Sequence, residues 1–319
     1  MENDNYMSYR VRVSGPHIAT VSLRSPLDFP HVNDHVLIAG SSGSGKSFFA
    51  SHLFPKTDGL ILFKPDPEFK RVPLVSKYGL PDLSHFKIPD IADAYLYSLG
   101  LDITGIMASS LVPLLMNGLS TSGLDVYKLQ NFLFNYMSGS DKMMSGIASL
   151  LHSHFEVLSS LFQGNKKFSH SKKLNLSFAG LGTFKAEFGA ELLLRDYYSR
   201  IGRSLGSLMI DEFHHVSRSG SIIDILLREM RLSGRLIAIT QNLTDLSPAM
   251  INNFGTILLG RSVNSDDMKF LSYFGNSKRY SSELPIIVSS LPKFCFLNFT
   301  EYLVSTDPVP IYRWYNDIN

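Results

Sequence analysis

The order of apolar and polar positions predicts strands that alternate with helices along most of the chain. Short apolar runs, typical of strands buried on both faces of a sheet, occur at 35–40, 59–69, 174–182, 207–212, 235–241 and 255–261. Apolar residues with helical spacing follow several of these runs, at 46–54, 185–201 and 221–234. Strands alternating with helices predict an α/β fold, with a mainly parallel central sheet that helices flank on both faces.

The two ends and one internal stretch depart from this alternation. Residues 9–23 alternate apolar and polar positions on both sides of a Gly-Pro pair, which predicts a hairpin. The segment 294–314 predicts a second, terminal hairpin, and the stretch at about 90–165 is mostly helical in its pattern. We therefore expect two parts: an N-terminal hairpin extension at 1–30, and a domain at 31–319 with a helical insertion.

Composition excludes several classes of protein. Of the 319 residues, 44% are apolar, which is too many for a disordered chain, and a net charge of +2 argues against a wholly basic nucleic-acid coat. The single cysteine, Cys295, cannot form an intrachain disulfide and fits a reducing compartment. The polar, acidic N-terminus is no signal peptide. Serines and Pro113 interrupt the longest apolar stretch, 103–119, so we expect a buried helix and no transmembrane segment.

A glycine- and serine-rich loop stands between the first apolar run and the helix after it. Its sequence, "GSSGSGKS", fits the pattern G-x-x-x-x-G-K-[ST] at every required position. Backbone N–H groups of such a loop curl around a phosphate, assisted by the helix N-terminus. Lys46 should reach the β- and γ-phosphates, and the Ser47 hydroxyl should bind Mg²⁺. The sequence thus predicts ATP and Mg²⁺ as cofactors, held by Gly40, Ser41, Ser42, Gly43, Ser44, Gly45, Lys46 and Ser47.

An acidic pair supplies what a phosphate loop lacks for hydrolysis. In "SLMIDEF", Asp211 ends a buried strand and should hold Mg²⁺, while Glu212 is placed to polarise the attacking water as general base. Gln241 ends the next strand, where it can lie between the loop and Asp211 and touch the γ-phosphate. Because adjacent histidines point different ways, we do not expect His214 and His215 to form a zinc site.

These motifs and their surroundings resemble the HerA/FtsK superfamily of ring-forming DNA pumps. The resemblance includes "GLILFKPDPEFK", "LREMRLSGRLIAITQN" and "INNFGTILLGRSVNSDDMKFLSYFG", and it runs from about Val36 to Trp314. The chain departs from the family pattern at Asn242, where many members have Arg-Pro, and at Lys64, where the first acid of the turn is displaced. We expect no counterpart here of the N-terminal barrel of cellular HerA or of the anchor and winged helix of FtsK.

The resemblance implies a ring, usually a hexamer, with ATP between subunits and an arginine supplied by the neighbour. Arg231 matches the family's R-x-x-G position, and Arg228, Arg235 and Arg261 are nearby alternatives. Non-specific DNA contact would come from basic loops, because tracking along phosphates needs no base readers. The candidates are Arg218, Lys278 and Arg279, and less favoured are Lys166, Lys167, Lys172 and Lys173. Any of these charged residues could instead be solvated surface.

We therefore expect an ATP-driven DNA translocase, an ATPase that packages a viral genome into a capsid. The alternatives are a plasmid or conjugative DNA-transfer motor, a protein-moving secretion or extrusion ATPase, a small-molecule kinase and a non-hydrolysing scaffold. The acidic pair, the Thr-Gln strand end and the lack of an Arg-rich lid disfavour a kinase. The expected partners are DNA, further copies of the chain, and capsid or membrane-vertex proteins. The expected location is the host cytoplasm or the virion.

Overall fold

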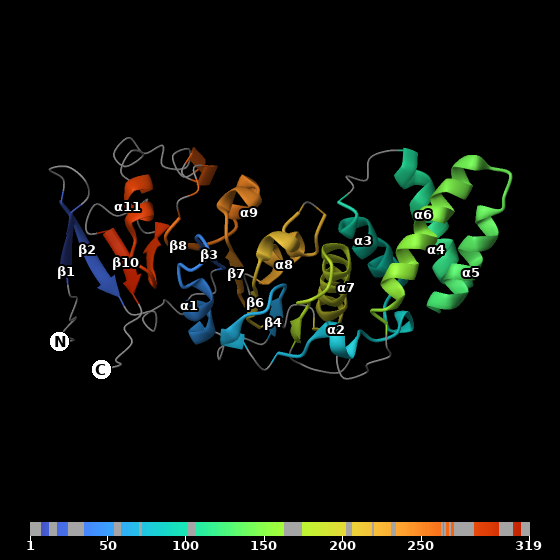
Figure 1. Cartoon of the computed structure of the whole chain (residues 1–319), viewed down its shortest axis with the longest axis horizontal. Coiled ribbons are helices and arrows are strands. Elements are labelled where there is room, and N and C mark those ends of the chain that lie inside the picture. Colours follow the sequence, from blue (N-terminus) through green and yellow to red (C-terminus); the bar gives the residue numbers. More distant parts are fainter. Residues whose placement is uncertain are drawn as a thin grey trace.

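The strands of the protein form one ten-stranded sheet, in the order β1-β2-β10-β9-β8-β3-β7-β6-β4-β5 (Figure 1). The computed structural model describes residues 8–12, 18–24, 35–53, 59–69, 72–100, 106–162, 174–201, 206–218, 220–230, 234–262, 264, 266–267, 269–270, 284–299 and 309–313. Everything below concerns these residues.

Six neighbouring strands form the parallel centre of the sheet. In spatial order they are β8 (Thr256–Leu259), β3 (Val36–Ala39), β7 (Leu236–Thr240), β6 (Leu208–Ile210), β4 (Gly59–Leu62) and β5 (Leu174–Ser177). Every adjacent pair among them is parallel. The predicted mainly parallel sheet is therefore confirmed, and each predicted apolar run contains one of its strands.

The terminal hairpins extend this sheet rather than standing apart from it. Strands β1 (Ser8–Arg12) and β2 (Ile18–Arg24) pair antiparallel, as do β9 (Cys295–Asn298) and β10 (Val309–Arg313). Strand β2 then pairs parallel with β10, and β9 pairs antiparallel with β8. The first and last segments of the chain thus meet side by side at one end of the molecule (Figure 1).

Helices cover both faces of the parallel strands. Successive side chains of a strand point to opposite faces, so Val36 and Ile38 share one apolar cluster and Leu37 and Ala39 the other. The first cluster includes Phe49 of α1 (Lys46–Leu53). The second takes in residues of α3 (Ile88–Ser98), α7 (Thr183–Ile201), α8 (Ile223–Glu229), α9 (Pro248–Ile251) and α11 (Leu284–Ser290). The expected two-faced arrangement is therefore present.

Helices also fill the region between β4 and β5. After the short α2 (Val75–Tyr78) and α3 come α4 (Ile106–Thr121), α5 (Val126–Met137) and α6 (Lys142–Ser159). Helices α4 to α6 pack together at the end of the molecule opposite to β1 and β2 (Figure 1). The Asp125 and Asp141 carboxylates accept backbone N–H groups at the starts of α5 and α6. Helix α4 carries the longest apolar stretch, and none of the helices described is long and apolar enough to cross a membrane.

Candidate nucleotide site

The strand order brings the predicted site residues to one edge of the sheet. Carboxyl ends of parallel strands lie at the same edge, and β7 lies between β3 and β6. Ala39 pairs with Thr240, and Ile210 pairs with Ala238, so these three strands end nearly level. The glycine-rich loop, Gln241 and the acidic pair follow them directly. The structure thus places Gln241 between the loop and Asp211, as the sequence predicts.

Backbone angles in the glycine-rich loop require glycine at two positions. Gly43 has φ of 80° and Gly45 has φ of 99°, in the region that side chains disfavour. A Cβ atom at Gly45 would also overlap the ring of Phe294. The loop then opens directly into α1, whose first residue is Lys46. The loop therefore has the strand–loop–helix context that a phosphate cradle needs.

Lys46 lies inside the loop, and its side chain is buried. Its Nζ donates to the carbonyl oxygens of Gly40 at 2.7 Å and Ser41 at 3.1 Å. Burial lowers the pKa of Lys46, and the nearby charges of Asp211 and Glu212 oppose that shift. The lysine of the loop and both predicted acids therefore lie within electrostatic reach of one another.

Asp211 is a buried carboxyl crowded by other acids. Its exposed fraction is 7%. Burial, and then the neighbouring charges of Glu212 and Asp66, raise its pKa to about 7. A divalent cation would relieve this crowding, and carboxylate and hydroxyl oxygens are the ligands that Mg²⁺ takes. The Ser44 hydroxyl is also buried, with no hydrogen-bond partner among the residues described, but it lies between Gly40 and Gly260, on the β8 side of β3 and away from β6 and Asp211. The buried, crowded carboxyl of Asp211 thus fits a position beside a magnesium–phosphate group.

Glu212 is held by two side chains through one of its carboxylate oxygens. Its Oε1 accepts from Lys64 Nζ at 2.8 Å and from Gln241 Nε2 at 2.5 Å. Burial raises the pKa of Glu212, but these two hydrogen bonds and the charge of Lys64 leave it below its usual value. The other oxygen, Oε2, is buried and accepts no hydrogen bond from the described part of the chain; it lies 3.5 Å from His214 Nδ1. The backbone of Glu212 is left-handed, with φ of 50°, a strain typical of functional positions.

Lys64 is a residue beside the acidic pair that the sequence motifs did not single out. It lies in the turn after β4, where the sequence shows it only as a departure from the family pattern. Strand β4 pairs with β6, so the turn after β4 must lie next to the acidic pair. The pairing of β4 with β6 would have placed Lys64 near the acidic pair, but that pairing cannot be predicted from the order of the strands along the chain.

The two histidines after the acidic pair correct the reason, though not the conclusion, of the prediction that they form no zinc site. Their rings do not point apart: the centroids of His214 and His215 lie 4.2 Å from each other, in a short 3₁₀ helix at Phe213–His215. His215 Nδ1 lies 3.1 Å from Glu187 Oε1. His214 and His215 therefore pack against each other and lie next to the carboxylates of Glu212 and Glu187.

The predicted basic contacts fall into two groups. Arg218 is ion-paired with Glu187 and lies over the ring of Tyr97, 4.9 Å from its centroid, with 42% of its side chain exposed. Arg228 Nε donates to Asp224 O at 3.0 Å, and Arg235 is partly buried. Outside the described residues lie Arg231, Lys278, Arg279, Lys166, Lys167, Lys172 and Lys173.

Arg261 stands beside the glycine-rich loop. Its carbonyl oxygen accepts from both the backbone N–H and the hydroxyl of Ser41, each at 2.8 Å, and its side chain is exposed. Of the three alternative arginines, Arg261 is thus the one fixed to the loop itself.

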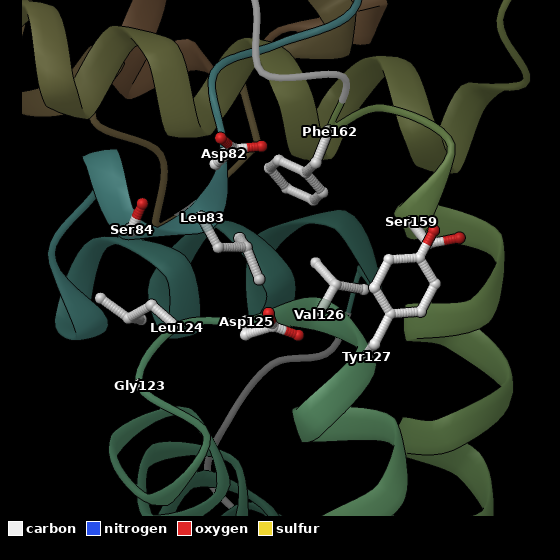
Figure 2. A pocket seen from close by; sticks show the side chains of 10 residues that line it. All are labelled: Asp82, Leu83, Ser84, Gly123, Leu124, Asp125, Val126, Tyr127, Ser159 and Phe162. Carbon is white, nitrogen blue, oxygen red and sulfur yellow. The ribbon is translucent and has the colours of Figure 1, made fainter.

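One further pocket lies in the helical region, lined by residues that include Asp82, Asp125, Tyr127 and Phe162 (Figure 2). Its volume is about 260 Å³. Asp125 in this pocket already caps α5, accepting from Lys128 N at 2.9 Å. No predicted site residue lines it, so it is separate from the nucleotide site.

Comparison with known proteins gives a match at the level of fold. No protein-family model and no curated protein matches the sequence. The solved structure of VirB4 from Thermoanaerobacter pseudethanolicus aligns over 89% of this chain and 90% of its own, with a TM-score of 0.66 and 16% identity. The bacterial conjugative coupling protein TrwBΔN70, in complex with sulphate, aligns over 88% and 84%, with a TM-score of 0.64 and 15% identity. The chain shares its fold with VirB4 and TrwB. The fold expected from the HerA/FtsK resemblance is therefore confirmed.

Proposed function

We propose that the protein is an ATPase that moves DNA through a ring of identical chains. The observation that carries this proposal is the convergence of Lys46, Asp211, Glu212 and Gln241 at one edge of the sheet. The fold shared with TrwB, a conjugative coupling protein, and the sequence resemblance support the DNA substrate.

Each residue then has a part in hydrolysis. The backbone of the glycine-rich loop and Lys46 bind the phosphates, and Ser47 and Asp211 would hold Mg²⁺, which supplies positive charge to the phosphate oxygens. Glu212 orients the attacking water and accepts its proton. Gln241, hydrogen-bonded to that carboxylate, links the γ-phosphate position to β7. An arginine from a neighbouring chain, with Arg231 as the first candidate, completes the site.

For the biological process we propose viral genome packaging, with Arg218, Lys278 and Arg279 as contacts to DNA phosphates. Plasmid or conjugative DNA transfer is the second candidate, supported by the similarity to TrwB. Affinity purification from infected or plasmid-bearing cells distinguishes them: capsid or vertex proteins would accompany a packaging motor, and conjugative membrane proteins a transfer motor.

ATP turnover with and without duplex DNA tests the proposed activity. We expect DNA to stimulate turnover, Lys46→Ala to abolish nucleotide binding or turnover, and Glu212→Gln to bind ATP but lose hydrolysis by about 100-fold or more. Glu156→Gln, an exposed acid on α6, is the matched control and should behave as the unmodified protein. Normal turnover by Glu212→Gln would remove it as general base. Phosphate transfer to a small acceptor would instead indicate a kinase.

A further inference from the structure

The position of the acidic pair fixes the direction in which a nucleotide would lie across the sheet edge. Strands β7 and β6 lie on one side of β3, and strands β8 and β9 lie on the other. Asp211, Glu212 and Gln241 follow the first group, so the γ-phosphate end of the nucleotide faces them. The base must then extend toward the β8–β9 side.

A strained segment meets the phosphate loop on that side. Strand β9 runs antiparallel to β8, so the segment entering β9 lies at the same edge as the loop. Phe294, the last residue before β9, donates its backbone N–H to Ser44 O at 2.9 Å. Its φ is 65°, which is rare for a bulky residue and persists only where the surroundings enforce it. Its ring packs over Gly45, where a Cβ would overlap it.

The ring of Phe294 forms a pair with Phe48, from the first turn of α1. Their centroids lie 5.0 Å apart at 58°, and both side chains are partly exposed. Lys293 Nζ lies over one face of the Phe294 ring, 4.8 Å from its centroid. Phe49, the next residue of the helix, is instead buried against Phe296. Phe48 is therefore the aromatic residue of α1 that remains at the edge of the site.

We propose that Phe48 and Phe294 are the base-binding residues of the site, and that a purine ring stacks on them. This proposal rests on the proposed nucleotide function and names the part of the ligand that the phosphate loop does not hold. Stacking on aromatic faces tolerates different bases, so the pair does not distinguish ATP from GTP. Inorganic tripolyphosphate, which has no base, gains nothing from them.

Binding of ATP, GTP and inorganic tripolyphosphate, each with Mg²⁺, tests this assignment by calorimetry. The variants are Phe294→Leu and Phe48→Leu, which keep an apolar side chain, with Phe134→Leu on the exposed face of α5 as the control. We expect either variant to weaken ATP and GTP about fivefold or more, the lower end of the contribution of a base–aromatic stack. Tripolyphosphate affinity should be unchanged in both variants, and the control should bind all three ligands normally.

An equal loss for ATP and tripolyphosphate would assign Phe48 and Phe294 to support of the loop and overturn the proposal, as would unchanged ATP affinity. Melting temperatures without ligand identify a variant that fails to fold, and the second variant then decides. Hydrolysis is measured separately. If ATP binds through Phe48 and Phe294 as expected but is not hydrolysed, the proposed ATPase function is wrong and the base-site proposal is supported. If the unmodified protein binds no nucleotide, both proposals are wrong.

Discussion

At Glu212 the two carboxylate oxygens have different surroundings, and this difference assigns a role to Lys64. Oε1 accepts hydrogen bonds from Lys64 and Gln241, whereas Oε2 has no hydrogen bond from the residues that the structure describes and lies 3.5 Å from His214 Nδ1. The two donors fix the rotation of the carboxylate. We therefore propose that Lys64 positions Glu212 for its role in hydrolysis, and its side chain is 54% exposed.

We expect Lys64→Met to lower the kcat of ATP hydrolysis by about tenfold, because a misplaced base is costly even over short distances. The KM for ATP should change less than about twofold, since Lys64 acts in positioning Glu212 and not in binding. Lys64→Arg keeps a charged donor and should recover most of the lost rate. Steady-state kinetics of the three proteins checks this. A raised KM with unchanged kcat would instead place Lys64 on the nucleotide.

The phosphate loop and the acidic pair were predictable from sequence, because backbone geometry demands glycine and a divalent metal demands a carboxylate at fixed places. Lys64 and Phe294 were not. Each meets the site through a turn that is distant in the chain, and neither residue type is required by the chemistry. Arg231, the predicted trans-acting arginine, stays a prediction.

Among the elements, β3 depends on a buried histidine at its start. His35 Nδ1 accepts the backbone N–H of Leu236 in β7 at 2.9 Å. Its Nε2 therefore carries the proton and donates to Leu227 O, in α8, at 2.6 Å. One imidazole thus joins the phosphate-loop strand to its neighbouring strand and to a helix of the second face.

His35→Phe should destabilise the protein by about 2–5 kcal/mol, because it leaves a buried backbone donor and a buried backbone acceptor unsatisfied. Urea unfolding measures the change as a lower midpoint. His152→Phe on α6, a partly exposed position, is the control and should stay within about 0.5 kcal/mol of the unmodified protein. Equal midpoints for the two variants would show that the bridge contributes little.

The elements themselves were largely predictable, because buried parallel strands read as uninterrupted apolar runs. Their neighbours were harder to predict. Alternation at 9–23 and 294–314 indicates two hairpins, but nothing in either segment shows that β2 pairs with β10. Such pairing depends on contacts between the two ends of the chain, which local periodicity does not encode.

At the scale of the whole molecule, one apolar core joins the helical region to the sheet. A single cluster of buried side chains contains Leu151 and Phe155 of α6, Leu115 of α4, Leu192 of α7 and Ile210 of β6. Helices α4 to α6 lie far along the molecule from α1 and the phosphate loop (Figure 1). The shared core implies that the two regions unfold together in spite of this separation, since neither can lose its packing alone.

We therefore expect one thermal transition that responds to changes at either end. Leu151→Ala should lower its midpoint by roughly 3–7 °C, because deleting a buried leucine costs about 2–5 kcal/mol. Mg²⁺ with a non-hydrolysable ATP analogue at about 100 times its Kd should raise the midpoint by a few degrees. Binding to the folded state alone adds about 2.7 kcal/mol of stability at that concentration. The two shifts should add, since the sites are distant. Scanning calorimetry that resolves two transitions, one moved only by nucleotide and the other only by Leu151→Ala, would show instead that the helical region is an independent unit.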